Sequence, residues 1–187
     1  MQTLGLSDST PRTENRLKSL FWPSIQNGAD VDYLGAQGYW VCVLVGGFSF
    51  VGSAVTGHPI LGLLVLLYYF LGGVGVRERS IYAAAAVLLF YVVDSLAAGI
   101  SVVRILFIAL LVSNLRAIWM TFRWAPESEE ASLPPRLAET WTDKFADRLP
   151  LWLWPKVRIF YYIFSAGVLV LTTVALALVA AGSSAIH

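Results

Sequence analysis

Long apolar runs separated by short polar turns dominate the pattern of hydrophobic and polar positions along the chain. Five runs have about the 20 residues with which a helix crosses a hydrocarbon layer. They cover Tyr39–Thr56, Ile60–Val76, Ile81–Ala98, Val102–Phe122 and Ile159–Ala181. None alternates apolar and polar residues as the strands of a membrane barrel do. Since lipid admits only helices and closed barrels, the pattern predicts an all-α, polytopic membrane protein with five transmembrane helices.

Composition agrees with this class of protein. Hydrophobic residues make up 57% of the chain and charged residues 13%, and the mean hydropathy is +0.68. These values are typical of membrane proteins and not of a soluble domain of 187 residues. The lipid bilayer is therefore an expected partner. Nucleic acid is not, because the sequence has no basic patch with interleaved aromatic residues.

Lys and Arg residues fall on alternate sides of the expected spans. They occur in the tail before the first span, in the turn after the second and in the segment after the fourth. The turns around His58 and Ile100, and the segment after the fifth span, contain none. Positive residues in short loops stay on the cytoplasmic side. The distribution predicts a plasma-membrane protein with a cytoplasmic N-terminus and an external C-terminus.

These elements divide the chain into four regions. Residues 1–36 form a cytoplasmic tail with a short interfacial segment, and residues 37–124 form a four-helix transmembrane unit. Residues 125–158 form a cytoplasmic loop that contains an interfacial helix. Residues 159–187 form the fifth transmembrane helix and a short external tail.

Three stretches are expected to lie on the membrane surface. In the loop, apolar residues recur every fourth position between charged residues, which predicts an amphipathic interfacial helix; they are Leu137, Trp141, Phe145 and Leu149. The following segment, Pro150–Pro155, predicts a rigid aromatic stretch at headgroup depth, where Trp is favoured. A shorter interfacial segment in the tail consists of Leu17, Leu20, Phe21 and Trp22.

Small residues follow one face of the first span. In lipid, where the hydrophobic effect does not pull helices together, such a face lets two backbones approach closely. We expect it to pack inside the monomer and not to line a pore, and we place Val45 off this face. The face consists of Gly38, Cys42, Gly46, Ser49, Ser53 and Gly57.

Two charged residues stand inside the third and fourth spans. Asp94 lies five residues before Gly99 and Arg104 five residues after it, so a tight hairpin places them at equal depth. Either charge alone in hydrocarbon costs about 3 kcal/mol, and pairing offsets much of this. We favour a structural ion pair, because no other expected span contains an acidic residue that could relay a proton. A proton- or ion-coupled site is the other interpretation.

Asn114 and Arg116 lie in the cytoplasmic half of the fourth span. Asn114 is expected to form a hydrogen bond between helices, which contributes about 1 kcal/mol in membranes. Arg116 is expected to reach the phosphates of cytoplasmic lipids. An anion site that combines Arg116 with Arg77 and Arg79 is the alternative.

Motifs for catalysis, cofactors or metal ions are missing from the sequence. His58 and His187 are far apart, and Cys42 is the single cysteine. There is no HExxH motif, P-loop, CxxC pair or nucleophile elbow. We therefore expect no catalytic, cofactor-binding or metal-binding residue and no enzyme, although a lipid-modifying enzyme stays open.

Three short segments resemble a pattern in small uncharacterised bacterial membrane proteins. They are Gln37-Gly38-Tyr39-Trp40, Asn114-Leu115-Arg116-Ala117 and Thr121-Phe122-Arg123-Trp124. The resemblance covers residues 20–124. It implies a four-span unit in a bacterial inner membrane, with the fifth span as an appendage, and it implies no activity.

The sequence as a whole favours a non-catalytic integral membrane protein. Its expected role is that of an accessory, scaffold or sensor-like component of a membrane assembly, with a membrane-protein partner or a second copy of itself. The alternative is a small homo-oligomeric channel or transporter. In that case Asp94 and Arg104 would face the transport path.

Overall fold

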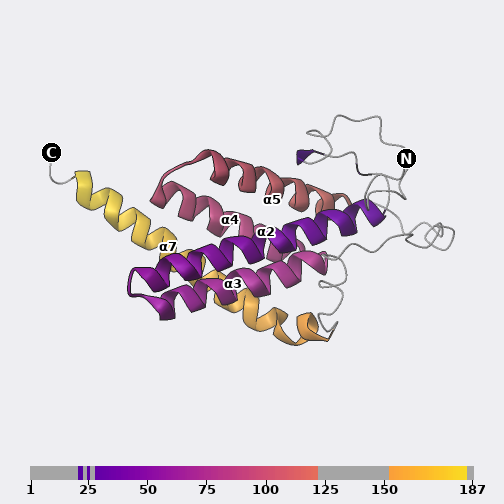
Figure 1. Cartoon of the computed structure of the whole chain (residues 1–187), viewed down its shortest axis with the longest axis horizontal. Coiled ribbons are helices and arrows are strands. Elements are labelled where there is room, and N and C mark those ends of the chain that lie inside the picture. The colour runs from indigo at the N-terminus through magenta and orange to yellow at the C-terminus, as the bar shows by residue number, and fades with distance from the viewer. Residues whose placement is uncertain (1–20, 23–24, 26–27, 122–151, 185–187) are drawn as a thin grey trace.

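Five long helices make up most of the residues that the structure, a computed structural model, describes. The structure describes residues 21–22, 25, 28–121 and 152–184. Each of the five helices is long and apolar enough to cross a membrane, as expected of a multi-pass membrane protein. They are α2 (Gly28–Val55), α3 (Pro59–Arg77), α4 (Ile81–Ala98), α5 (Val102–Thr121) and α7 (Leu153–Ser184) (Figure 1).

The all-helical fold with five membrane-length helices is confirmed, and α3, α4 and α5 begin and end within one residue of the prediction. Two helices are longer than predicted. α2 begins at Gly28 and not at Tyr39, and α7 begins at Leu153 and not at Ile159. The borders expected after residues 36 and 158 therefore fall inside helices. The interfacial helix expected over residues 137–149, and Leu17 and Leu20 of the tail segment, lie outside the described residues.

Short turns connect the consecutive helices α2, α3, α4 and α5, which run alternately up and down. Gly57 and Gly99, with φ of 83° and 94°, adopt the left-handed conformation that glycine tolerates best. Pro59 opens α3, where a missing backbone N–H costs no helical hydrogen bond. Between α3 and α4 the left-handed residue is Arg79, with φ of 56°. There the N–H of Ser80 donates to Gly75 O at 2.9 Å, which closes the end of α3.

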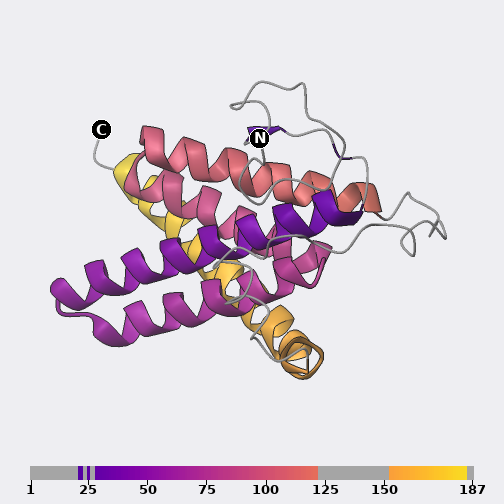
Figure 2. The same ribbon diagram turned by 45° about the vertical axis from the view of Figure 1, so that its right-hand side comes forward.

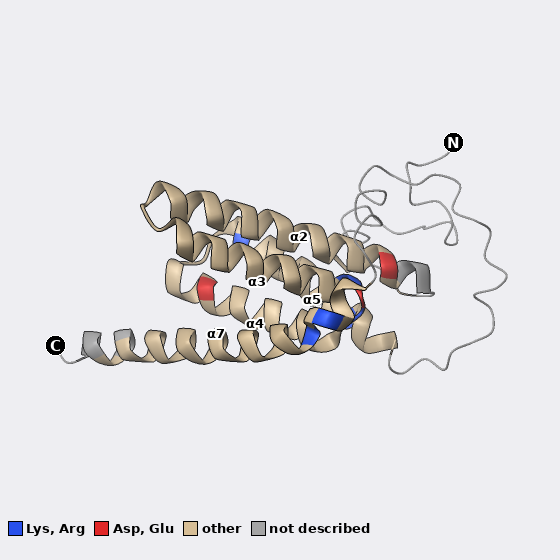
Figure 3. Ribbon diagram, turned by 90° about the horizontal axis from the view of Figure 1, so that it is seen from below, with Lys and Arg blue, Asp and Glu red and all other residues tan. Residues whose placement is uncertain are grey.

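The two ends of the bundle differ in charge. Apart from Arg104, the described Lys and Arg residues lie at the end that holds the start of α2, the α3–α4 turn, the last turns of α5 and the start of α7. Figure 3 shows this gathering of basic residues at one end of the molecule. We call the half that contains it the basic half. The distal half contains the α2–α3 turn, the α4–α5 turn and the C-terminal part of α7.

Glycines of α3 bring three helices close together in the basic half. A Cβ at Gly75 would overlap Trp154 of α7 and Ala83 of α4, and a Cβ at Gly72 would lie 2.5 Å from the Tyr161 hydroxyl. Gly73 faces the other way, toward α2. In lipid, helices associate through such close packing of small residues. The resulting core is rich in aromatic side chains, among them Tyr68, Tyr69, Phe90, Trp154 and Tyr161.

Trp154 corrects one expectation. It was placed in a rigid aromatic segment at headgroup depth, but it belongs to the first turn of α7 and is only 7% exposed. Its ring lies 5.8 Å from that of Tyr161 and fills the space that Gly75 leaves. Trp152, two residues earlier, is exposed, with Lys156 Nζ 4.9 Å from its ring centre.

The distal half is much less covered. α2 packs along α3, but the side chains around their connecting turn are mostly exposed. Figure 2 shows the α2–α3 hairpin diverging from α4 and α5 toward this end. α7 crosses α3 and α4 obliquely, and most of its described side chains beyond Ser165 are exposed or half-buried (Figures 1 and 2). The chain thus combines a closely packed half with an open one.

Candidate functional site

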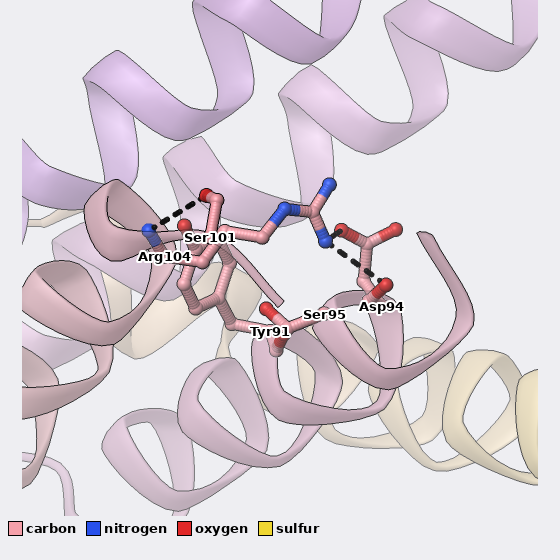
Figure 4. A network of polar contacts seen from close by, with 5 residues as sticks. All are labelled: Tyr91, Asp94, Ser95, Ser101 and Arg104. Carbon is pink, nitrogen blue, oxygen red and sulfur yellow. Dashed lines mark hydrogen bonds and ion pairs between the residues drawn. The ribbon is translucent and has the colours of Figure 1, made fainter. Parts of the chain in front are cut away.

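The structure brings Asp94 and Arg104 together, in the distal half. Arg104 Nη1 donates to Asp94 Oδ2 at 3.1 Å and to the backbone carbonyl of Asp94 at 3.0 Å. Ser101 directly precedes α5, and its hydroxyl accepts from the N–H of Arg104 at 3.3 Å. Figure 4 shows the two charged side chains reaching toward each other from α5 and α4. The tight turn at Gly99 places both residues at the same level, as their equal distance from it predicted.

Asp94 lies on the face of α4 that turns toward the core. It follows Phe90 by four residues and Tyr91 by three, and both of these are buried. Its own side chain is nevertheless 48% exposed, and that of Arg104 is 26% exposed. The core-facing side of α4 therefore continues beyond the point at which other helices cover it.

The matching face of α3 is uncovered at the same end. Leu61 and Leu64 precede buried Tyr68 by seven and four residues, which is the spacing of one helical face. Both are exposed, at 57% and 46%. The hydrophobic face that α3 and α4 share in the basic half thus remains open where it reaches the Asp94–Arg104 pair.

A second ion pair closes the basic end, and it was not predicted from the sequence. Arg79 donates to Asp32 Oδ1 from Nη2 at 2.7 Å and from Nε at 3.0 Å. The next residue, Ser80, caps α4 at Ala83 N and shares a hydrogen bond of 2.9 Å with Tyr162 of α7. The three-residue turn between α3 and α4 is in this way attached to both α2 and α7.

Asp32 is a second acidic residue on a helix of membrane length. Because α2 begins early, a membrane-length stretch of it, Val31–Val55, contains this acidic residue. The five expected spans contain no acidic residue besides Asp94, and the longer α2 adds Asp32 near its start. Asp32 and Asp94 lie at opposite ends of the bundle, since one faces the start of α4 and the other stands near its end.

The polar residues proposed for the cytoplasmic half have different partners. Asn114 Nδ2 donates to the backbone carbonyl of Leu34 at 2.7 Å, across α2 and α5. The Arg116 guanidinium carbon lies 4.5 Å from the ring centre of Trp22, which is exposed. Arg79 binds Asp32, and the backbone of Arg77 lies beside Gly35 of α2. The ion pair with Asp32 occupies Arg79, and an anion site that combines it with Arg77 and Arg116 stays a prediction.

The small face of α2 lies mostly against α3. A Cβ at Gly46 would lie 3.1 Å from Cβ of Tyr69, and Ser53 Cβ lies 2.9 Å from the Cβ position of Gly62. Cys42 is buried against Gly73, and Gly38 lies against Val76 and Asn114. The half-buried Ser49 has no such described approach.

Two residues differ from the expected face. Gly57 stands in the turn after α2, where a Cβ would have nothing within 4 Å, so its role is conformational. Val45, which was placed off the face, is 7% exposed and belongs to the core. α2 is covered on this side as well, because it contacts α5 in addition to α3.

Comparisons with known proteins add no family to this picture. No family model, no curated protein and no solved structure matches the chain. Among the residues that the structure describes, no three His, Cys, Asp or Glu side chains gather as a metal site. The Asp94–Arg104 pair and the open face beside it form the candidate functional site.

Proposed function

We propose that this chain is a non-catalytic accessory or scaffold subunit of an assembly in a bacterial inner membrane. A partner membrane protein covers the open faces of α3 and α4 in the distal half. The observation that carries the proposal is the half-exposed carboxylate of Asp94 on a face that is core elsewhere.

Depth makes this exposure significant. Asp94 precedes the last residue of α4 by four positions, which places it about 6 Å inside the end of the helix. Charged groups at such depths pair with each other, face water or meet a protein partner, because lipid solvates them poorly. Arg104 contacts only one of the two carboxylate oxygens. A partner that donates a hydrogen bond to the other oxygen would complete the pair.

The charge pattern supports one orientation. The basic half would face the cytoplasm and the distal half the external leaflet, following the preference of Lys and Arg for the cytoplasmic side. The N-terminus is then cytoplasmic and the C-terminus external. The partner surface lies in the external leaflet under this orientation.

The same open face favours one alternative, a small homo-oligomeric channel or transporter. If water and not protein covers Leu61 and Asp94, the ion pair lines an aqueous path. Ionisable residues inside membrane proteins commonly mark such paths. The two functions differ in what lies next to Leu61.

A paired experiment separates them. Leu61 and Leu63 have similar exposure, 57% and 56%, but Leu63 points away from the face of Tyr68. A photo-crosslinking amino acid is placed at each position in the native host. The accessory function predicts one discrete protein adduct from position 61, none from position 63, and a weaker adduct in the Asp94→Asn variant.

Two other outcomes contradict the accessory function. Lipid adducts at both positions would show that the open face simply contacts the bilayer. If position 61 yields no protein adduct while Leu61→Cys, but not Leu63→Cys, reacts with a charged thiol reagent, the face is aqueous. That result would favour the channel or transporter.

A further inference from the structure

A second polar site lies inside the basic half, where α2 crosses α5. Asn114 is 1% exposed, and its amide group lies against Gly38, whose Cβ position is 2.9 Å from Asn114 Nδ2. Ser113, the preceding residue, is fully buried. Gln37 precedes Gly38 directly, so all these residues lie within one helical turn of the contact.

Three oxygen atoms at this crossing have no protein donor among the described residues. They are Gln37 Oε1, Ser113 Oγ and Asn114 Oδ1, and all are buried. The orientation of the Asn114 amide is fixed, because only its nitrogen can donate to the Leu34 carbonyl, which lies at 2.7 Å. Its oxygen must therefore point to something other than that carbonyl. A buried acceptor without a donor is costly, so a ligand that donates is expected here.

Ser113 differs from other hydroxyl residues of these helices. Ser95, Ser165 and Thr172 each donate to a backbone carbonyl three or four residues earlier, at 2.6, 3.1 and 2.6 Å. Such local bonds are the usual way to satisfy a hydroxyl inside a membrane helix. The Ser113 hydroxyl has no such bond and is free for a ligand.

The chemistry of the three oxygens selects the ligand. The two amide oxygens can only accept and therefore repel an anion, and the hydroxyl of Ser113 offers it a single donor. A cation would lack a neutralising carboxylate, because Asp32, the acidic side chain described on α2, is bound to Arg79. Water fits, since it donates twice and needs two to four polar partners to stay in a protein interior.

We propose that Gln37, Ser113 and Asn114 form a hydration site that bridges α2 and α5 inside the membrane. Asn114 lies seven residues before the end of α5, which at the rise of an α-helix is roughly two helical turns. Water would therefore reach the site from the basic end of the bundle. At the site, Asn114 joins α5 to α2 directly through its hydrogen bond to Leu34, and bridging water would supply further hydrogen bonds between the two helices.

Thiol labelling tests the proposal in the full chain, with Cys42→Ala removing the native cysteine. Ser113→Cys and Gln37→Cys are compared with Ile118→Cys in membrane vesicles, using a small charged methanethiosulfonate reagent. Ile118 is also fully buried and lies closer to the basic end, but it packs against Val76 and Ala84. Hydration predicts labelling at least tenfold faster at positions 113 and 37 than at 118. Equally slow labelling at all three would overturn the proposal, and Gln37→Cys keeps the test valid if the Ser113 variant fails to fold.

A second measurement separates water from a cation. The melting temperature of the purified chain is compared in sodium, potassium and choline chloride at constant ionic strength. The hydration site predicts the same value in all three salts. A rise in sodium or potassium that disappears in Asn114→Leu would assign the site to a cation and overturn the proposal.

Discussion

The basic and distal halves are built from the same helices, but α3, α4 and α7 pack closely together only in the basic half. In the basic half, glycines of α3 let aromatic rings of α7 and small side chains of α4 approach closely, and buried polar groups bond across helices. In the distal half the same faces of α3 and α4 continue, but Leu61, Leu64 and Asp94 lack a covering helix. Hydrophobicity alone does not hold helices together in lipid. The difference teaches that helices of this chain pack together only where their backbones approach closely. Where the backbones diverge, the packing between the helices ends.

Gly75→Leu is expected to have the largest effect, because it attacks the packed half directly. The new side chain would collide with Trp154 and Ala83, neither of which can move far in a buried core. We expect a loss of about 3 kcal/mol or more, which most membrane bundles do not survive. The temperature at which the detergent-solubilised variant loses solubility measures this loss of stability. Gly167→Leu is the control on α7, where nothing lies within 4 Å, and it should melt like the native chain.

Gly46→Leu tests where the packed half ends along α2. Its Cβ would lie 3.1 Å from Tyr69 Cβ and 3.4 Å from Leu66 Cα, so α2 and α3 would have to separate. We expect a destabilisation of about 1–3 kcal/mol. Gly47→Leu is the matched control, since the next residue has nothing within 4 Å. If both variants melt alike in the same assay, close approach is not what joins these helices.

The Asp94–Arg104 pair sharpens the comparison from the distal side. Asp94→Asn and Arg104→Gln should each lower stability by about 1 kcal/mol, because each leaves a partly buried charge without its partner. The double variant should recover part of the loss. Unfolding of all four proteins gives the coupling energy. Strictly additive losses would mean that the two groups act independently, each through water or a partner.

Two substitutions of Arg79 have the smallest expected difference in stability. They distinguish the effect of backbone strain at this position from that of the ion pair. Arg79→Ala and Arg79→Gly both remove the ion pair with Asp32. Glycine also relieves the left-handed backbone conformation at φ 56°, which costs a residue with a Cβ more than it costs glycine. Arg79→Gly should therefore be the more stable of the two by about 1 kcal/mol. The melting temperatures of the two variants measure the difference. The reverse order would mean that the turn does not keep this conformation.

Hydropathy predicted the helices because long apolar runs have few other structures available in lipid. It failed at the starts of α2 and α7, where tertiary contacts decide. Val31 and Leu34 are buried in a stretch that also contains Asp32, so its mean hydropathy understates its packing. Trp154 has the sequence context of an interfacial residue and becomes core only because Gly75 faces it.

The candidate site was predictable to the extent that it is local. Asp94 and Arg104 are joined by a turn, so their distances from Gly99 sufficed to place them side by side. Asp32 and Arg79 are 47 positions apart, and no pattern in the sequence links them. The glycines of α3 are a sequence signal for close helix packing, in the segment Gly72-Gly73-Val74-Gly75. Partial exposure of Asp94 depends on where neighbouring helices diverge, which periodicity does not encode.

The glycines of α3 also determine which positions of the sequence can accept substitutions during evolution. Gly72 and Gly75 face α4 and α7, where a Cβ would overlap neighbouring atoms, and Gly73 faces α2, where a Cβ would lie 3.0 Å from Cys42 Cβ. Both sides of this helical turn are therefore closely packed. Gly47, Gly52 and Gly167 have open space around them and carry no such restriction. Among descendants of this sequence, substitutions should accumulate at these three open positions. Positions 72, 73 and 75 should stay glycine for as long as the three helices remain together.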